Sequence, residues 1–202
     1  MTKQIIITID REYGSGGRYI SNVLSKLYGI NVYGHNMLSL IAQEKGLNLD
    51  ELKKFDEKKR NIWFTRSVDG FSNSPEDNVA QMQFDFLKEK ADAGESFIAL
   101  GRCGNYILRD YSNVVRIFIT GDLEKRIERI AETKEMSLAK AEVFVEKENK
   151  IRKNYHNYYS KQKWGDSRHY DLIVNASKIG LDNAVEVIDR YIKSTENDIN
   201  DI

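Results

Sequence analysis

The sequence predicts an α/β protein with a parallel sheet, and three observations support this prediction. Short apolar runs alternate with helical patterns along the whole chain, as in proteins built from right-handed β-α-β units. Glycines rather than prolines separate these runs, because Pro75 is the only proline. The unusual residues come directly after apolar runs, and ligands of open α/β sheets bind at the carboxyl ends of strands. The expected strands are 4–9, 30–33, 96–100, 113–120 and 171–174.

The first β-α unit contains a glycine-rich connection. Residues 4–9 form a β-branched run, Gly14-Ser15-Gly16-Gly17 follows it, and Gly29 is expected to end the next helix. The helix between them has one apolar face with i, i+3, i+4 and i+7 spacing, formed by Ile20, Val23, Leu24 and Leu27. The chain therefore opens as strand, glycine loop and helix.

A first helical insertion is expected at about 34–93. Residues 37–45 have the pattern of a helix, and Asn48 begins a polar helix with an acid three residues later. Ser74-Pro75-Glu76 combines a cap, a proline in the first helical position and an acid in the first turn. It therefore begins a longer helix, which Gly94 ends.

A second helical insertion is expected at about 121–169. Asp122 is expected to cap a helix, and a long charged helix follows over about 137–159. An amphipathic helix over about 181–192 closes the chain. The remaining segments make up the core of one domain, 1–202, at about 1–33, 94–120 and 170–202.

Composition restricts the partners. The 202 residues include 31 Lys+Arg and 31 Asp+Glu, so the formal net charge is zero. Nucleic acids and anionic membranes bind through basic surfaces, which makes both unlikely partners. Cys103 is the single cysteine, so no internal disulfide can form, and no apolar run reaches the length of a membrane span. We expect a cytoplasmic protein without a membrane partner, and its oligomeric state stays open.

The glycine loop has the composition of a phosphate cradle. Glycines let backbone amides turn toward an anion at the start of a helix, although a tight turn without a ligand is the alternative. The dinucleotide pattern G-x-G-x-x-G would need glycine at Tyr19, and G-x-x-x-x-G-K-[ST] would need lysine at Gly17. Arg18 supplies a cation one residue later, and Arg11 is a further candidate before the loop.

Arginines elsewhere could surround a phosphate. Arg102 follows a strand directly between Gly101 and Gly104, a placement that is hard to explain by packing. Arg126 and Arg129 share one helix face. The segment 149–163 has five basic residues and no acid: Lys150, Arg152, Lys153, Lys161 and Lys163. Most of these lysines are expected to lie on a solvated face.

An aromatic stripe runs through the same basic segment, at Tyr155, Tyr158, Tyr159 and Trp164. Aromatic and basic residues together can bind single-stranded nucleic acid. Such a stripe more often packs against the core, and we expect packing here.

No metal site is predicted. His35, His156 and His169 lack metal-ligand spacing, and one cysteine cannot complete a zinc site. Cys103 has no histidine near it in the sequence, so we expect a buried thiol rather than a nucleophile. Asp10 is a candidate to orient the loop or to approach Mg²⁺ indirectly, with a simple cap as the alternative.

Three segments resemble the cytidylate kinase-like family of P-loop proteins: ITIDREYGSGGRYIS, GRCGNYIL and YHNYYSKQKWGDSRHYDLIVNAS. The resemblance implies a nucleoside monophosphate kinase fold with a three-layer, P-loop NTPase-like core. The insertion at 34–93 would then bind a monophosphate, and 121–169 would form a lid. It also implies phosphoryl transfer from ATP to a nucleotide such as CMP or dCMP. Mg²⁺ is implied by the reaction class, with no protein ligand identified.

The resemblance also implies roles for single residues. The ATP phosphates would be bound by Gly14, Ser15, Gly16, Gly17, Arg18 and Tyr19. Arg102 would hold the acceptor phosphate, and Asn175 and Ser177 would lie near the ATP base. Charge for the transfer would come from Arg18, Arg126, Arg129 and Arg152.

Six positions depart from the pattern of the family or of its active kinases: Gly17, Tyr19, Gly34, Cys103, Val145 and Asn149. Gly17 replaces a loop lysine, Tyr19 a threonine, and Cys103 an aspartate. These departures support a second hypothesis, a non-catalytic nucleotide- or phosphometabolite-binding module with a regulatory role. A nucleic-acid-binding protein is the third hypothesis, and the zero net charge disfavours it.

Overall fold

The centre of the protein is a five-stranded sheet with the order β2-β5-β1-β6-β7. All neighbouring strands run parallel, which confirms the predicted α/β fold. The computed structural model describes residues 4–56, 67–68, 71–72 and 74–197. Its strands are β1 (Ile6–Arg11), β2 (Asn31–Tyr33), β5 (Phe97–Leu100), β6 (Val114–Thr120) and β7 (Leu172–Asn175).

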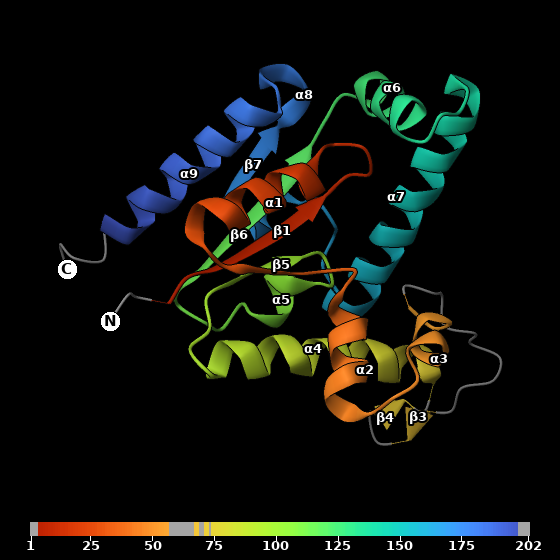
Figure 1. Ribbon diagram of the computed structural model, residues 1–202, viewed down its shortest axis with the longest axis vertical. Helices are drawn as coiled ribbons and strands as arrows, with labels where there is room; N and C mark the ends of the chain where they lie inside the picture. Colours follow the sequence, from red (N-terminus) through yellow and green to blue (C-terminus); the bar gives the residue numbers. More distant parts are fainter. Residues whose placement is uncertain (1–3, 57–66, 69–70, 73, 198–202) are drawn as a thin grey trace.

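Different helices cover the two faces of the sheet, which gives three layers (Figure 1). One face packs against α1 (Gly17–Tyr28) and α9 (Leu181–Asn197). The other face packs against α2 (Met37–Lys45), α4 (Pro75–Asp92) and α5 (Gly104–Ile107).

Strand β1 lies at the centre of both cores. Ile7 and Ile9 pack toward α1 and α9, whereas Ile6 packs toward α2 and α4, and all three are fully buried. This alternation follows from the two-residue period of a strand. Burial on both faces explains why the run is apolar throughout rather than alternating with polar residues.

The long helix α7 (Leu138–Ser160) passes the edge where the strands end and joins α6 (Leu123–Thr133) to the region of α4 (Figure 1). Helices α6 and α7 share a small core of their own around Ile130, Ala141 and Val145. The remaining elements are α3 (Leu49–Lys53), the antiparallel pair β3 (Ser67–Val68) and β4 (Phe71–Ser72), a 3₁₀ turn at Ser167–His169, and α8 (Ala176–Ile179).

Two of the expected helix caps form side-chain capping bonds, and the third has the expected position only. The Asn48 side chain accepts from the amides of Asp50 and Glu51, and the Ser74 side chain accepts from the amide of Asp77. Asp122 occupies the N-cap position of α6, but its side chain makes no capping bond. Its carboxylate instead pairs with Lys178 of α8 and accepts a hydrogen bond from Asn175 at the end of β7.

The first strand lies two residues further along the chain than expected, at Ile6–Arg11 rather than 4–9. It extends past Ile9 because Asp10 and Arg11 keep their pairing with Phe118 and Ile119 of β6. The backbone of Arg11 therefore belongs to the sheet rather than to the loop.

The division into a core, an insertion at 34–93 and a lid at 121–169 stays a prediction. Residues 1–3, 57–66, 69–70, 73 and 198–202 of that division lie outside the described residues. No helix within the described part of the chain is both long enough and apolar enough to cross a membrane.

Candidate functional site

The glycine loop joins β1 to α1 in a conformation that requires glycine. Gly14 has φ +81° and Gly16 has φ +90°. A Cβ atom on Gly14 would lie 2.8 Å from the carbonyl oxygen of Arg126, and one on Gly16 would overlap Leu181. Gly16 has no side chain that could cap α1. The first amide N–H groups of this helix have no acceptor within the helix and stay available to a ligand. These amides and the helix dipole make the start of α1 attractive to an anion.

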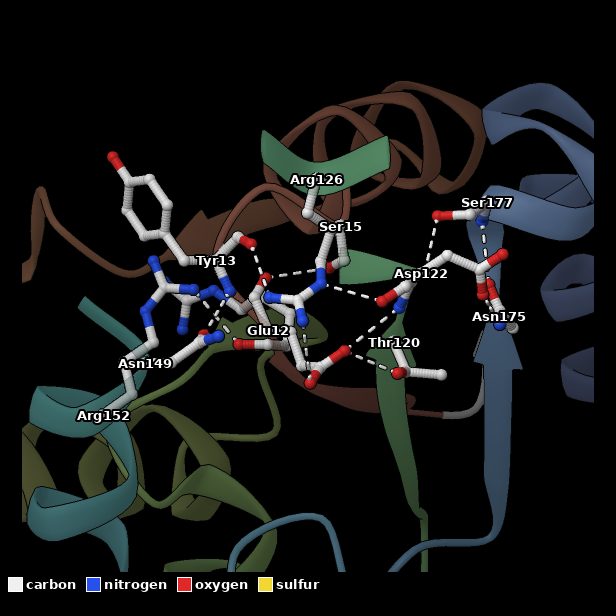
Figure 2. A network of polar contacts seen from close by, with 12 residues as sticks. Glu12, Tyr13, Ser15, Thr120, Asp122, Arg126, Asn149, Arg152, Asn175 and Ser177 are labelled. Atoms are coloured by element: carbon white, nitrogen blue, oxygen red, sulfur yellow. Dashed lines mark hydrogen bonds and ion pairs between the residues drawn. The ribbon is translucent and has the colours of Figure 1, made fainter. Parts of the chain in front are cut away.

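Arg126 supports this loop from within the protein (Figure 2). Its side chain is 7% exposed, and Nη2 lies 3.5 Å from Oε1 of Glu12. Its Nε donates to the carbonyl of Gly121 at 2.8 Å and its Nη1 to the carbonyl of Tyr13 at 3.3 Å. The structure thus places Arg126 against backbone and a carboxylate. Its predicted part in phosphoryl transfer stays a prediction.

Arg129 and Arg152 also contact the backbone of the loop. Arg129 donates to the carbonyl of Gly14. Arg152 donates to the carbonyl of Arg11 at 3.1 Å, and its guanidinium lies 4.8 Å from the ring centre of Tyr13. The three arginines that the resemblance assigns to a lid therefore all donate hydrogen bonds to backbone carbonyl groups in or beside the loop. That these arginines bring positive charge to the reacting phosphate stays a prediction.

Two of the departing positions have structural roles. The Oδ1 atom of Asn149 accepts from the amide of Tyr13 at 2.7 Å, so this residue joins α7 to the loop. Val145 is fully buried between α6 and α7, where a basic side chain would lose its hydration. Sequence reasoning missed the contact of Asn149 because the two residues are 136 positions apart.

Glu12 ties the ends of β1 and β6 together (Figure 2). Its Oε2 accepts from the hydroxyl of Thr120 at 2.6 Å and from the amide of Gly121 at 3.1 Å. Sequence reasoning did not single out Glu12. An acid between an apolar strand and a glycine loop was the available signal.

Asn175 and Ser177 extend this network to β7. The Ser177 hydroxyl accepts from the amide of Asp122 at 3.0 Å, and the Asn175 amide donates to the Asp122 carboxylate at 3.0 Å. Both residues therefore lie at the correct edge of the sheet for a ligand site. Their predicted place near a nucleotide base stays a prediction.

Arg102 is held in an unusual backbone turn. Gly101, Arg102 and Cys103 have φ values of +77°, +56° and +56°, and each non-glycine residue in this region costs about 1 kcal/mol or more. Arg102 is buried, and its Nη2 donates to Asp56 at 2.9 Å. Cys103 is buried as expected. Strain of this kind points to a functional position for Arg102, and the pairing with Asp56 was not anticipated.

The cations of the site gather around one place. Burial lowers the pKa of His35, and the charges of Arg18, Arg102 and Arg11 lower that pKa further. Arg18 is exposed and forms no ion pair with any residue that the structure describes. Tyr19, beside it, donates its hydroxyl to Asp182 at 2.6 Å. The ends of β1 and β5 and the start of α1 therefore create a positive field that suits a phosphate.

The family model described as cytidylate kinase-like matches residues 6–178. The chain belongs to this family. It is 28% identical over 177 residues to the cytidylate kinase of Pyrococcus horikoshii, which covers 87% of this chain and 81% of that one. It is 26% identical over 192 residues to the cytidylate kinase of Methanococcus aeolicus, covering 93% and 97% of the two chains.

Solved structures agree with the kinase fold. The crystal structure of an uncharacterized protein from Eubacterium ventriosum has a TM-score of 0.76 and 33% identity, covering 95% of this chain and 99% of that one. The shikimate kinase of Bacteroides thetaiotaomicron has a TM-score of 0.56 at 10% identity, covering 94% and 98%. The latter shows the fold alone. This member of the cytidylate kinase-like family thus has the α/β fold that is also seen in shikimate kinase.

The described residues contain no cluster of metal ligands at the glycine loop. No group of three or more His, Cys, Asp or Glu that could hold a metal exists among the described residues. In the loop, the hydroxyl of Ser15 donates to the carbonyl of Glu12, and that of Tyr19 donates to Asp182. Mg²⁺ prefers free carboxylates together with substrate phosphates.

A buried polar cluster lies beneath the site and joins α7 to β1. His156 Nε2 lies 3.1 Å from Oδ1 of Asn105 and 3.7 Å from Oδ2 of Asp10. Tyr170 donates to the same Asp10 oxygen at 3.0 Å, and burial raises the pKa of Tyr170. Asp10 is therefore a buried anchor rather than a cap.

The stability of the protein is expected to fall as the pH drops below about 6.5, the ordinary pKa of histidine. Burial lowers the pKa of His156 in the folded state more than Asp10 raises it. The unfolded chain then binds more protons between the two pKa values, so acid favours unfolding. Urea unfolding at pH 7.5 and pH 5.0 should show a smaller loss for His156→Gln than for the wild type. Equal losses in both proteins would contradict this assignment.

Tyr155, Tyr159 and Trp164 of the aromatic stripe pack against the core as expected, whereas Tyr158 is exposed. Tyr155 and Tyr159 pack with Phe84 and Cys103, and Trp164 meets Phe118 edge-on at 5.3 Å between ring centres. The Tyr159 hydroxyl donates to Asp77 at 2.8 Å. These rings thus fix α7 to α4 and to the sheet.

Proposed function

We propose that this protein binds ATP at the glycine loop and transfers a phosphoryl group to a nucleoside monophosphate, with CMP or dCMP as the expected acceptor. The observation that carries the proposal is the side-by-side position of the loop and Arg102. Strands β1 and β5 are parallel neighbours in which Ile9 pairs with Leu100. The glycine loop that follows β1 and the Gly101-Arg102 turn that follows β5 therefore share one edge of the sheet.

This arrangement suits phosphoryl transfer, which needs alignment and positive charge more than covalent help. An oxygen of the acceptor phosphate would attack the γ-phosphorus, and the bond to the bridging oxygen would break with its electron pair leaving on ADP. The amides at the start of α1 and Arg18 would hold the donor phosphates. Arg102 would bind the acceptor phosphate, and its ion pair with Asp56 would have to break for this to happen.

The choice of acceptor rests on relatives. The Pyrococcus and Methanococcus relatives are cytidylate kinases, and the match extends over most of both chains. A monophosphate of cytidine is therefore the first acceptor to test. Shikimate is the natural comparison, because shikimate kinases share the fold.

A second candidate function is a nucleotide-binding module without catalysis. It is favoured by the ion pair between Arg102 and Asp56. In such a module the loop would bind a nucleotide, while Asp56 would keep Arg102 from an acceptor.

Thermal unfolding with added ligands tests both candidates. ATP with Mg²⁺, CMP and dCMP are each expected to raise Tm in a concentration-dependent manner, whereas shikimate should not. A coupled assay of ADP release should then show turnover with CMP or dCMP. Stabilisation without turnover would favour the binding module, and the absence of any nucleotide response would reject both candidates.

A further inference from the structure

The side chain of Arg11 crosses the base of the glycine loop. Its Cγ and Cβ lie 2.7 and 2.8 Å from the place that a Cβ atom on Gly17 would occupy. At its other end, Nη1 lies against Gly101, where a Cβ atom would overlap it. Arg11 thus runs from the first residue of α1 to the residue before Arg102. It spans the expected donor and acceptor sites.

This position explains why lysine is absent from the loop. In the pattern G-x-x-x-x-G-K, aligned on Gly16, glycine stands at position 11 and lysine at position 17. This chain has the reverse, Arg11 and Gly17. The stem of Arg11 fills the space that any side chain at position 17 would need. The arginine and the glycine are therefore a matched pair.

We propose that Arg11 replaces the loop lysine and that its guanidinium binds the phosphoryl group passing between donor and acceptor. This inference rests on the proposed function. A guanidinium is always charged and has five N–H donors, which suits the three oxygens of a phosphoryl group. The lysine of ordinary loops reaches the same oxygens from α1, whereas Arg11 reaches them from the end of β1.

Two further observations support this placement. The carbonyl of Arg11 accepts from Arg152 at 3.1 Å, and its backbone pairs with Ile119 of β6, so the root of the side chain is fixed. Arg11 also acts with Arg18 and Arg102 to lower the pKa of His35. The three charges therefore approach one place, as a shared phosphate ligand requires.

A charge exchange between positions 11 and 17 tests the proposal. Arg11→Met keeps the stem over Gly17 and removes the charge, so affinity for ATP and for inorganic tripolyphosphate should fall about tenfold or more. Gly17→Lys alone should also bind poorly, because Arg11 fills its space. The double variant Arg11→Gly/Gly17→Lys should recover affinity relative to both single variants. Calorimetry measures binding, and thermal unfolding checks that each variant is folded.

Arg109→Ala is the matched control, since this arginine stacks on Tyr106 and pairs with Asp110 away from the loop. It should bind like the wild type. By NMR, the pKa of His35 should rise in Arg11→Met and keep its wild-type value in Arg109→Ala.

The outcomes separate this inference from the proposed function. Wild-type binding in Arg11→Met, or a folded double variant no better than the single variants, overturns the role of Arg11 and leaves the kinase proposal intact. If the wild type binds tripolyphosphate but no nucleotide, the kinase proposal fails and the tripolyphosphate measurements decide the role of Arg11. If the wild type binds neither, both are overturned.

Discussion

Replacing Arg102 with alanine is expected to lower kcat/KM for the monophosphate acceptor by about 10²–10³-fold, the usual cost of one lost transition-state donor. Affinity for ATP should change little, because the donor phosphates are expected on the amides of α1. The reason is geometric. The Gly101–Cys103 turn accepts three consecutive positive φ angles and directs a buried guanidinium to the edge where the loop lies. Steady-state kinetics with varied CMP, together with calorimetry for ATP, would measure the two effects separately.

The variant Asp56→Asn tests the same acceptor site from the other side of the ion pair. It removes the carboxylate that holds Arg102 at 2.9 Å but keeps an amide of the same shape. A monophosphate then meets less competition, so its affinity should stay the same or increase. Weaker monophosphate binding in Asp56→Asn would contradict the assignment of the acceptor site. So would an equal loss of ATP and CMP affinity in Arg102→Ala.

Replacing Arg126 with alanine is expected to destabilise the protein by about 3 kcal/mol, since breaking a buried ion pair leaves the partner charge uncompensated. Glu12 would lose its cation, and the carbonyls of Gly121 and Tyr13 would lose a donor. Because these groups shape the loop, ATP affinity should fall with stability. Urea unfolding measures the first effect and calorimetry the second.

Lys125→Ala provides the control on the same helix. Lys125 pairs with Glu128 on the exposed face of α6, where salt bridges contribute little. It should leave both stability and ATP binding unchanged. If Arg126→Ala kept wild-type stability, the supporting role of this arginine would be rejected. If it lost ATP turnover but not stability, the lid role implied by the resemblance would gain support instead.

The fold could be predicted from the sequence because its signals are local. A buried parallel strand is a short β-branched run, and the helix starts at Asn48 and Ser74 depend on hydrogen bonds to residues two or three positions away. The same holds for the glycine loop, whose composition predicts its positive φ angles. The α5 and β3–β4 elements are too short to give a periodic signal.

The support of the candidate site could not be predicted, because it depends on residues far apart in the sequence. Arg152 and Arg11 are 141 positions apart, and Asn105 and His156 are 51 apart. The pattern of basic residues indicates that arginines are available, but not whether they face a ligand or a carbonyl. The place of Arg11 in the sheet could not be predicted either. The expected strand ended at Ile9, and the polar residues after it gave no sign that the strand continues.

Helix α7 has the geometry of a lever with one end fixed. His156 is buried against the core, Arg152 lies about 6 Å from it along the axis, and Leu138 lies about 27 Å from it. A rotation about His156 would move Arg152 only about a fifth as far as the Leu138 end. Arg129 lies on α6, beyond that far end. An outward rotation would therefore break the contacts with the loop in order. The bond from Arg129 to Gly14 would break first, and the bond from Arg152 to Arg11 last.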